Sequence, residues 1–241
     1  MVIRAVIFDL DGTLIDTTHE IQYIFNQLLE SYSLPKRSFD FFKENIGNGV
    51  EDLLQKSLPY NYSKDISPML EEVKEIYAEN LNKKSRPFED IKEILDLLNQ
   101  NGIQIGIITN KMHHLAVRCV DTFFPSHKIM TIGAGHLHPR KPSPDSALVL
   151  ASEFKTKPSE MLFIGDSSVD IKTAKNAGMV PIGVEWGNGA LKELLDAGAQ
   201  EVFNKPYDLK SYFNHVAHFF KFLFWLGFAV NRQPLPCVCI S

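Results

Sequence analysis

Two aspartates follow an apolar run near the start of the chain. The run Val2 to Phe8 is typical of a buried strand, and Asp9 and Asp11 come directly after it. Residues two apart in an extended chain point the same way, so both carboxylates are expected to face one spot beyond the strand. Two like charges held together are unfavourable unless a cation lies between them, and Mg²⁺ takes oxygen ligands of this kind. The stretch therefore indicates a site for a hard divalent cation; the alternative is an ordinary acidic turn.

A helical pattern begins after Asp16 and continues to about residue 84. Apolar residues recur at helical spacing in several segments, and no strand pattern interrupts them. We expect residues 17–84 to form a helical insertion between the first strand and the rest of the chain. Within it, the loop Gly47-Asn48-Gly49 precedes a helix. Its free N–H groups could meet an anion, or it is a simple turn.

From residue 86 to about residue 205, strand and helix patterns alternate. Strands are predicted at Ile103 to Ile108, Lys128 to Ile132, Met161 to Ile164 and Val180 to Val184. Such alternation predicts an α/β fold, with a parallel, Rossmann-like sheet and helices on both faces. In these sheets, ligands bind beyond the carboxyl ends of the strands.

Polar residues follow several of the predicted strands, as a shared site requires. Thr109 and Asn110 follow the second strand, the pair Arg140-Lys141 follows the third, and Asp166 follows the fourth, with Asp170 one helical turn later. Together with the aspartates of the first strand, they place carboxylates, a hydroxyl and a lysine at one edge of the sheet. Binding of a phosphate group together with a divalent metal ion would explain why all of these residue types occur at one edge.

With these residues, the chain resembles phosphatases of the haloacid dehalogenase superfamily, specifically those of the phosphoglycolate phosphatase type. Four signatures occur in order: Asp9-Leu10-Asp11-Gly12-Thr13, Thr109-Asn110, Lys141-Pro142 and Gly165-Asp166-Ser167-Ser168-Val169-Asp170. The resemblance covers roughly residues 3–205. It implies a core domain formed by residues 1–16 and 85–208 and a small helical cap domain formed by residues 17–84.

The resemblance also implies a catalytic role for four side chains. Asp9 would attack phosphorus and form an aspartyl phosphate, which divides one hard step into two easier ones. Asp11 would protonate the leaving group and then deprotonate the attacking water. Thr109 would donate a hydrogen bond to a phosphoryl oxygen, and Lys141 would neutralise both Asp9 and the phosphoryl charge.

Mg²⁺ is the cofactor that the resemblance implies. Asp166 would bind it together with Asp9 and the backbone carbonyl of Asp11, and Asp170 would orient either the metal shell or Lys141. The four aspartates carry up to four negative charges, against three positive charges from Mg²⁺ and Lys141. We therefore expect catalysis to depend on Mg²⁺ absolutely.

Substrate choice is expected to lie with the cap, because the core side chains contact only phosphate and metal. Candidate contacts are Gly47, Asn48, Gly49 and Asn110, together with Thr17, Ile46, Lys111 and Arg140. The expected partner is a small phosphorylated metabolite, with 2-phosphoglycolate the best match. Pyrophosphate, nucleoside monophosphates and sugar phosphates, or a phosphomutase reaction, remain alternatives. A regulator that binds a phospholigand without turnover is the alternative of another class.

The composition limits the environment and the partners of the chain. It has 241 residues with a net charge of −4 and no dense basic stripe, so no nucleic-acid partner is expected. Three cysteines do not make a disulfide framework, which favours free thiols in a reducing compartment. With no signal-peptide pattern, we expect a cytoplasmic protein.

The last segment, residues 209–241, is a hydrophobic extension that the resemblance does not cover. Apolar residues crowd between Phe213 and Val230, but Lys221 interrupts them and the uninterrupted run is shorter than a membrane span of ~20 residues. Packing on the core or self-association is expected in preference to membrane contact, because positive residues on its polar side are sparse. The chain is accordingly expected to be a monomer or a homodimer.

Overall fold

The computed structural model describes residues 2–135, 138–225 and 235–236, with side-chain surroundings for residues 3–135 and 138–215. Within this part of the chain, the centre is a six-stranded sheet in the order β6-β5-β2-β7-β8-β9, and all neighbouring strands run parallel. The expected α/β fold with a parallel sheet is confirmed. The strands are β2 (Ala5–Phe8), β5 (Gln104–Met112), β6 (Ile129–Ala134), β7 (Met161–Gly165), β8 (Val180–Val184) and β9 (Glu201–Phe203).

Strand β2 lies at the point where the winding of the sheet reverses. The chain places β5 and β6 on one side of β2, and β7, β8 and β9 on the other. This is the doubly wound order, in which ligands bind outside the carboxyl ends of the strands at the point of reversal. Asp9, the residue after β2, therefore lies between the carboxyl ends of β5 and β7.

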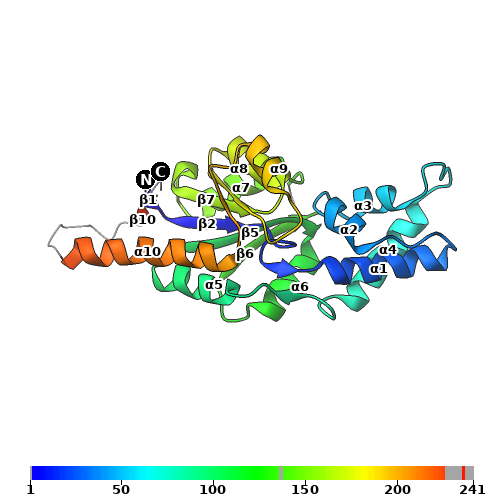
Figure 1. Ribbon diagram of the computed structural model, residues 1–241, viewed down its shortest axis with the longest axis horizontal. Coiled ribbons are helices and arrows are strands. Elements are labelled where there is room, and N and C mark those ends of the chain that lie inside the picture. The colour runs from blue at the N-terminus through cyan, green and yellow to red at the C-terminus, as the bar shows by residue number, and fades with distance from the viewer. Residues whose placement is uncertain (1, 136–137, 226–234, 237–241) are drawn as a thin grey trace.

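Helices cover both faces of the sheet (Figure 1). One face carries α7 (Asp145–Glu153), α8 (Ser168–Ala177) and α9 (Leu191–Ala197), and a short 3₁₀ helix, Pro158–Glu160, precedes β7. The other face carries α5 (Ile91–Gln100), α6 (His113–Phe123) and α10 (Pro206–Trp225).

The residues of β2 alternate between two apolar clusters. Val6 and Phe8 belong to one buried cluster, whereas Ala5 and Ile7 belong to the other. Successive side chains of a strand point to opposite faces, so both faces of β2 are covered. A strand buried on both sides shows a continuous apolar run instead of an alternating one, which is the pattern of this segment.

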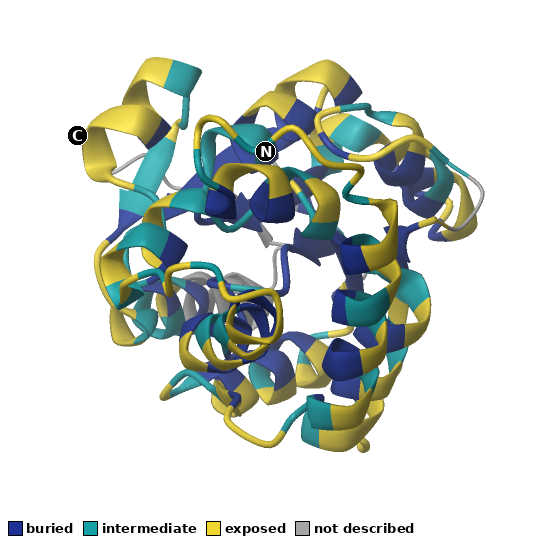
Figure 2. Ribbon diagram, turned by 90° about the vertical axis from the view of Figure 1, so that its right-hand side faces the viewer, coloured by how far each residue is buried: buried dark blue, intermediate teal, exposed yellow. Residues whose placement is uncertain are grey.

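In the fully described stretch between β3 (Ile15–Asp16) and β4 (Arg86–Pro87), the chain forms four helices. These inserted helices are α1 (Thr18–Ser31), α2 (Phe39–Asn45), α3 (Val50–Ser57) and α4 (Ser67–Asn80), and they form one end of the molecule in Figure 1. Figure 2 looks onto this end and shows their buried and exposed residues on opposite sides. The short strands β3 and β4 pair antiparallel, so the chain leaves and re-enters the sheet region side by side.

The chain ends differ from the sequence prediction in one respect. The segment Val2 to Phe8 is two strands, because Arg4 interrupts it and β1 (Val2–Ile3) pairs with β10 (Leu235–Pro236) instead of joining the parallel sheet. The side chains of residues 216–241 lie outside the described residues, as do the predictions of packing or membrane contact made for them. Among the described helices, none combines the length and the apolar character that crossing a membrane requires.

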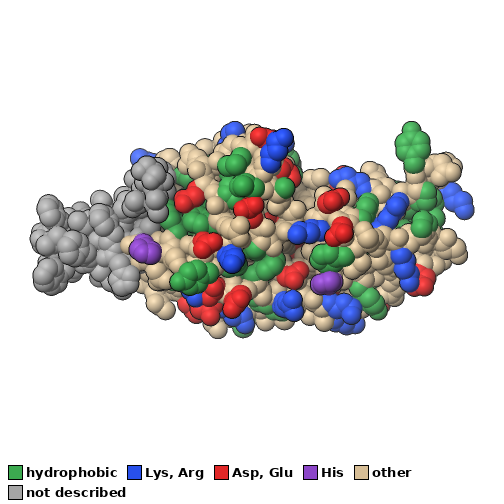
Figure 3. All heavy atoms as spheres, viewed as in Figure 1, with side chains coloured by type: hydrophobic (Ala, Val, Ile, Leu, Met, Phe, Trp, Pro, Cys, Tyr) green, Lys and Arg blue, Asp and Glu red, His purple; other side chains and the backbone are tan. Residues whose placement is uncertain are grey.

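Charged side chains of both signs are mixed on the face shown in Figure 3. Basic and acidic groups lie next to one another over the inserted helices and over the sheet region, in keeping with the small net charge of −4. An anionic ligand must therefore be held by local positive charge, because no broad field on this face would concentrate it.

Candidate active site

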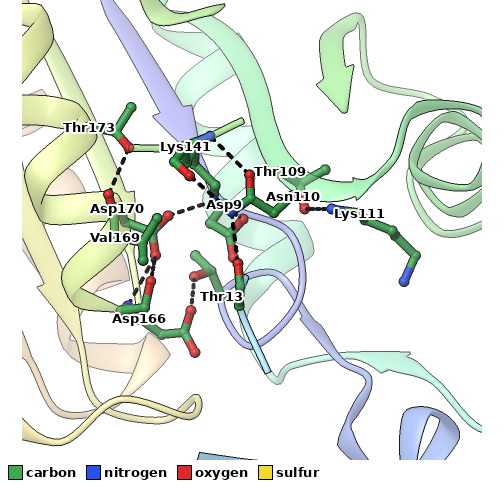
Figure 4. A network of polar contacts seen from close by, with 12 residues as sticks. Asp9, Thr13, Thr109, Asn110, Lys111, Lys141, Asp166, Val169, Asp170 and Thr173 are labelled. Atoms are coloured by element: carbon green, nitrogen blue, oxygen red, sulfur yellow. Dashed lines mark hydrogen bonds and ion pairs between the residues drawn. The ribbon is translucent and has the colours of Figure 1, made fainter. Parts of the chain in front are cut away.

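Lys141 forms ion pairs with two aspartates at the carboxyl end of the sheet (Figure 4). Its Nζ lies 2.5 Å from Asp9 Oδ1 and 2.6 Å from Asp170 Oδ1, and all three side chains are buried. Burial alone would lower the pKa of Lys141, but the charges of Asp170 and Asp9 outweigh it and raise the pKa. The lysine is therefore a buried ammonium shared between two carboxylates.

Asp166 follows β7 and is held by two donors from distant segments. Thr13 Oγ1 donates to Asp166 Oδ1 at 3.2 Å, and the backbone N–H of Asn188 donates to Oδ2 at 2.7 Å. Burial, with the charge of Asp170, raises the pKa of Asp166 to about 7. Burial likewise raises the pKa of Asp9 well above its ordinary value, although Lys141 opposes the shift. The site holds more negative charge than Lys141 alone compensates.

This acidic cluster suits a divalent cation. Asp9, Asp166 and Asp170 are buried, and each offers an oxygen within 4.8 Å of the others. Carboxylate oxygens are among the hard donors that Mg²⁺ takes in proteins. Asp170 also accepts from the backbone N–H and the hydroxyl of Ser167, at 3.0 and 2.6 Å. Asp170 thus contacts both Lys141 and Ser167, which agrees with one of its two expected roles, that of orienting Lys141.

Asp11 lies beside a second buried lysine. Lys111 Nζ is 2.9 Å from Asp11 Oδ1 and donates to the hydroxyl of Tyr77, on the inserted helix α4, at 2.7 Å. Burial alone would lower the pKa of Lys111, but Asp11 and Tyr77 outweigh it and raise the pKa. The sequence suggested Lys111 only as a substrate contact and gave no local signal for Tyr77.

Thr109 and Asn110 lie inside β5, although the sequence placed them after it. Thr109 Oγ1 accepts from the backbone N–H of Lys111 at 3.1 Å. The Asn110 amide accepts from Lys141 N at 3.0 Å and donates to Gly47 O at 2.9 Å and Lys141 O at 3.3 Å. The peptide bond from Lys141 to Pro142 is cis. Asn110 therefore contacts backbone on both sides of the site.

Most of the predicted site residues line one cavity of about 60 Å³, and Asp170 is not among its lining residues. Its polar wall is formed by Asp9, Asp11, Thr109, Asn110, Lys111, Lys141, Asp166, Ser167 and Asn188, with Gly47 and Gly49 at its edge. The opposite wall is apolar and comes mainly from the inserted helices, with Ile21, Phe25, Ile46, Val50, Leu53 and Met112. Asn48 is exposed and does not line the cavity, nor does Thr17. Arg140 approaches the loop from the core, since a Cβ at Gly49 would lie 2.9 Å from its Nη1.

Two glycines of the signatures let carboxylates approach the backbone closely. Gly12 has a φ of +88°, and a Cβ at this position would lie 2.2 Å from Asp166 Oδ2. A Cβ at Gly165 would lie 2.3 Å from Cβ and Cγ of Asp170. A side chain at either position would displace an aspartate of the acidic cluster.

Residues 6–184 match the family model described as Haloacid dehalogenase-like hydrolase. The chain belongs to this family. The matched range includes the four aspartates, both lysines and Thr109, so the haloacid dehalogenase-like match covers the lining of the cavity except Asn188.

Relatives in the haloacid dehalogenase-like family are named as phosphatases. The phosphoglycolate phosphatase of Haemophilus influenzae strain 86-028NP is 31% identical over 206 residues, covering 82% of this chain and 92% of the relative. That of Mannheimia succiniciproducens is 29% identical over 211 residues, with 84% and 94% covered. The N-acetylmuramic acid 6-phosphate phosphatase of Pseudomonas aeruginosa is 27% identical over 189 residues, with 78% and 84% covered.

A solved structure from Haemophilus somnus, described as a predicted phosphoglycolate phosphatase, has a TM-score of 0.79 and 26% identity. The alignment covers 86% of this chain and 96% of that structure. The chain is therefore a phosphatase of the phosphoglycolate phosphatase-like type. The names of its relatives differ in the substrate, which leaves the physiological phosphate ester to be inferred.

Proposed function

We propose that the protein is a Mg²⁺-dependent phosphatase that hydrolyses a small phosphorylated metabolite through an aspartyl phosphate on Asp9. The observation that supports this proposal best is the buried Asp9 carboxylate, held 2.5 Å from Lys141 Nζ in a cavity that Asp11 and Thr109 also line. A nucleophile, an acid–base group and phosphate-binding donors thus face one small space.

In the first step, an Asp9 oxygen forms a bond to phosphorus as the bond from phosphorus to the leaving oxygen breaks. Asp11, protonated at this point, transfers its proton to the leaving oxygen, which departs as an alcohol. Lys141 remains beside Asp9 and reduces the repulsion between the carboxylate and the incoming phosphoryl group. The Thr109 hydroxyl is the donor for a phosphoryl oxygen.

In the second step, a water molecule attacks the phosphorus of the aspartyl phosphate. Asp11, now ionised, takes a proton from the water, and the bond between phosphorus and the Asp9 oxygen breaks. Inorganic phosphate leaves, and Asp9 is restored as a carboxylate. Asp11 ends the cycle protonated, ready for the next leaving group.

Asp9 and Asp166 would hold Mg²⁺, with the backbone carbonyl of Asp11. When bound, the ion supplies positive charge that orients the phosphoryl group and offsets its negative charge. Among the described residues, four carboxylates and two ammonium groups belong to the site: Asp9, Asp11, Asp166, Asp170, Lys111 and Lys141. With one divalent cation and Asp11 protonated, this set carries one net positive charge before substrate binds, which favours entry of an anionic ester.

The small cavity favours a small leaving group. A volume of about 60 Å³ has room for only about four to six water molecules, at ~10–15 Å³ of centre-accessible space each. We propose that residues 17–84 act as a cap on the core of residues 1–16 and 85–208, so this cavity is the space left when the cap is closed. Of the candidates considered, 2-phosphoglycolate and pyrophosphate are the smallest, and the phosphoglycolate phosphatases among the relatives favour the first. A nucleotide or a muramic acid phosphate would require the cap to move away.

A panel of phosphate esters tests the proposal. We expect 2-phosphoglycolate to be hydrolysed with the highest kcat/KM, compared with pyrophosphate, nucleoside monophosphates and sugar phosphates.

A variant of Asp9 tests the nucleophile. Asp9→Asn keeps the shape of the side chain and should lower kcat at least ~10⁴-fold, and Asp121→Asn, at an exposed position, serves as the control. Excess chelator should abolish turnover. Full activity in chelator or in Asp9→Asn would contradict the mechanism, and equal rates on every ester would remove the 2-phosphoglycolate assignment.

A further inference from the structure

Lys111 joins the proposed acid–base residue to an inserted helix. Its side chain is 3% exposed, and its Nζ lies 2.9 Å from Asp11 Oδ1 and 2.7 Å from the Tyr77 hydroxyl. The same Nζ lies 4.7 Å from the centroid of the Tyr77 ring, so the ring and the hydroxyl both contact the ammonium. Asp11 and Lys111 belong to the core, whereas Tyr77 belongs to α4. The three side chains therefore form a contact between the two parts of the fold.

The orientation of Asp11 matters because this side chain must exchange a proton twice in each cycle. A well-placed general acid or base contributes ~10²–10⁴-fold in rate, and a misplacement of ~1 Å can cost ~10²-fold. Asp11 follows the end of β2 and precedes Gly12, whose φ of +88° turns the chain away. The side chain of Asp11 is 13% exposed at the cavity wall, and its Oδ1 is paired with the Lys111 ammonium.

We propose that Lys111 is a positioning residue for Asp11, and that Tyr77 holds Lys111 in this place from the inserted helices. The inference rests on the proposed function, in which Asp11 is the acid–base group. Its consequence is that the acid–base group is set for proton transfer only while α4 packs over the end of β5. A substrate that leaves the inserted helices displaced would meet the nucleophile but not a correctly oriented acid.

The alternative is that Lys111 binds the substrate. An ammonium has three N–H donors, and Asp11 and Tyr77 accept two of them, with the side chain almost wholly buried. A substrate anion would have to compete with a charge-assisted bond that is already formed. The positioning role is therefore favoured, and the two roles make different predictions for substrates that lack an anionic tail.

The experiment compares two such substrates in the full-length protein with Mg²⁺. Ethyl phosphate has an alkoxide leaving group that needs a proton, whereas 4-nitrophenyl phosphate has a leaving group that departs readily without one. The variants are Lys111→Met, the more conservative Tyr77→Phe, Asp11→Asn and the double variant of Lys111 and Asp11. Lys157→Met and Tyr60→Phe, both at exposed positions, are the matched controls. The quantity measured is kcat/KM, because it reports the steps up to departure of the leaving group.

We expect Lys111→Met to lower kcat/KM about 10²-fold for ethyl phosphate and less than about fivefold for 4-nitrophenyl phosphate. Tyr77→Phe should also lower kcat/KM more for ethyl phosphate than for 4-nitrophenyl phosphate, with a decrease of about tenfold on ethyl phosphate. In the Asp11→Asn background, Lys111→Met should cause no further loss on ethyl phosphate, because its effect passes through Asp11. This double-variant comparison separates a positioning role from a general loss of structure, because a loss of structure would lower kcat/KM for both substrates alike.

The inference would be overturned if Lys111→Met lowered kcat/KM equally for the two substrates. It would also be overturned if the effects of Lys111→Met and Asp11→Asn on kcat/KM added in the double variant. An unchanged rate on ethyl phosphate in Lys111→Met would overturn it as well. These outcomes are distinct from a failure of the proposed function. That failure would appear as a wild-type protein without Mg²⁺-dependent turnover, or as an Asp9→Asn variant that retains it.

Discussion

Asn110 connects parts of the active site that the chain order keeps far apart. Its carboxamide bonds the backbone N–H and carbonyl of Lys141 and the carbonyl of Gly47, in the loop before α3. The side chain is 6% exposed, so these bonds are shielded from water. We therefore assign its main effect to holding the Lys141 backbone and the inserted loop together, with substrate contact as a separate prediction.

Asn110→Asp is expected to break this connection while leaving the size of the side chain unchanged. A carboxylate oxygen would replace the Nδ2 donor and would face two carbonyl oxygens, each of which loses its partner. Leaving buried groups unpaired costs ~1–3 kcal/mol each, so we expect the free energy of unfolding in urea to fall by about 2 kcal/mol or more. The kcat should fall at least ~10-fold as Lys141 loses its support. Asn61→Asp, at an exposed position, is the control; equal stability of both variants would refute this role.

Most of the site residues could be predicted from the sequence because they lie at or after the carboxyl ends of strands in one parallel sheet. Asp9, Thr109, Lys141 and Asp166 are brought together by the fold alone, whatever surrounds them. Tyr77 could not be predicted, since its hydroxyl reaches Lys111 only through the packing of an inserted helix. Two further features could not be predicted for the same reason. The backbone N–H of Asn188 reaches Asp166 through a loop, and Asn48 is exposed and outside the cavity although Gly47 and Gly49 line it.

At the scale of elements, Glu20 holds the two ends of the inserted helices together. It lies in the first turn of α1, is 1% exposed, and accepts the backbone N–H groups of Asn82 at 3.1 Å and Lys84 at 2.9 Å. Asn82 in turn donates to Thr122 Oγ1 of α6 at 3.0 Å. Beside these bonds lie β3 and β4, two-residue strands that no periodic pattern could reveal. The linker of residues 81–85, which leads from α4 back to β4, is thus fixed both to the inserted helices and to the core.

Replacing Glu20 should loosen this linker and destabilise the fold. Glu20→Ala leaves two backbone N–H groups without their acceptor, which we expect to cost about 2–3 kcal/mol of unfolding free energy. Glu20→Gln keeps one acceptor oxygen and should cost less. Urea denaturation measures both effects, and amide hydrogen exchange should become faster at Asn82 and Lys84 in particular. Glu75→Ala, an exposed glutamate of α4, should change neither quantity, and equal effects of the two alanine variants would contradict the role of Glu20.

For the whole molecule, the acidic cluster is a cost to the metal-free fold. Burial and the neighbouring Asp170 raise the pKa of Asp166 to about 7, whereas an unfolded aspartate titrates near ~3.9. As the pH rises, Asp166 therefore loses its proton at a lower pH in the unfolded chain than in the folded one. The metal-free fold thus loses stability as the pH rises from about 4 through about 7. A divalent cation held by Asp9 and Asp166, as proposed above, would remove this penalty. Metal binding at one sheet edge would then be linked to the stability of the entire chain.

Thermal unfolding at pH 8 tests this link. A ligand that binds only the folded state adds ~2.7 kcal/mol at 100 times its Kd, and ~1 kcal/mol shifts the Tm of a chain of this size by ~2–4 °C. We therefore expect saturating Mg²⁺ to raise the Tm by about 5–10 °C, with a further rise when fluoroberyllate is added as a phosphoryl mimic. Asp166→Asn should melt at or above the metal-free wild type, because it lacks the buried charge, and should not respond to Mg²⁺. Asp121→Asn should respond as the wild type does. A Mg²⁺ shift of full size in Asp166→Asn would place the ion elsewhere and remove Asp166 from the metal site.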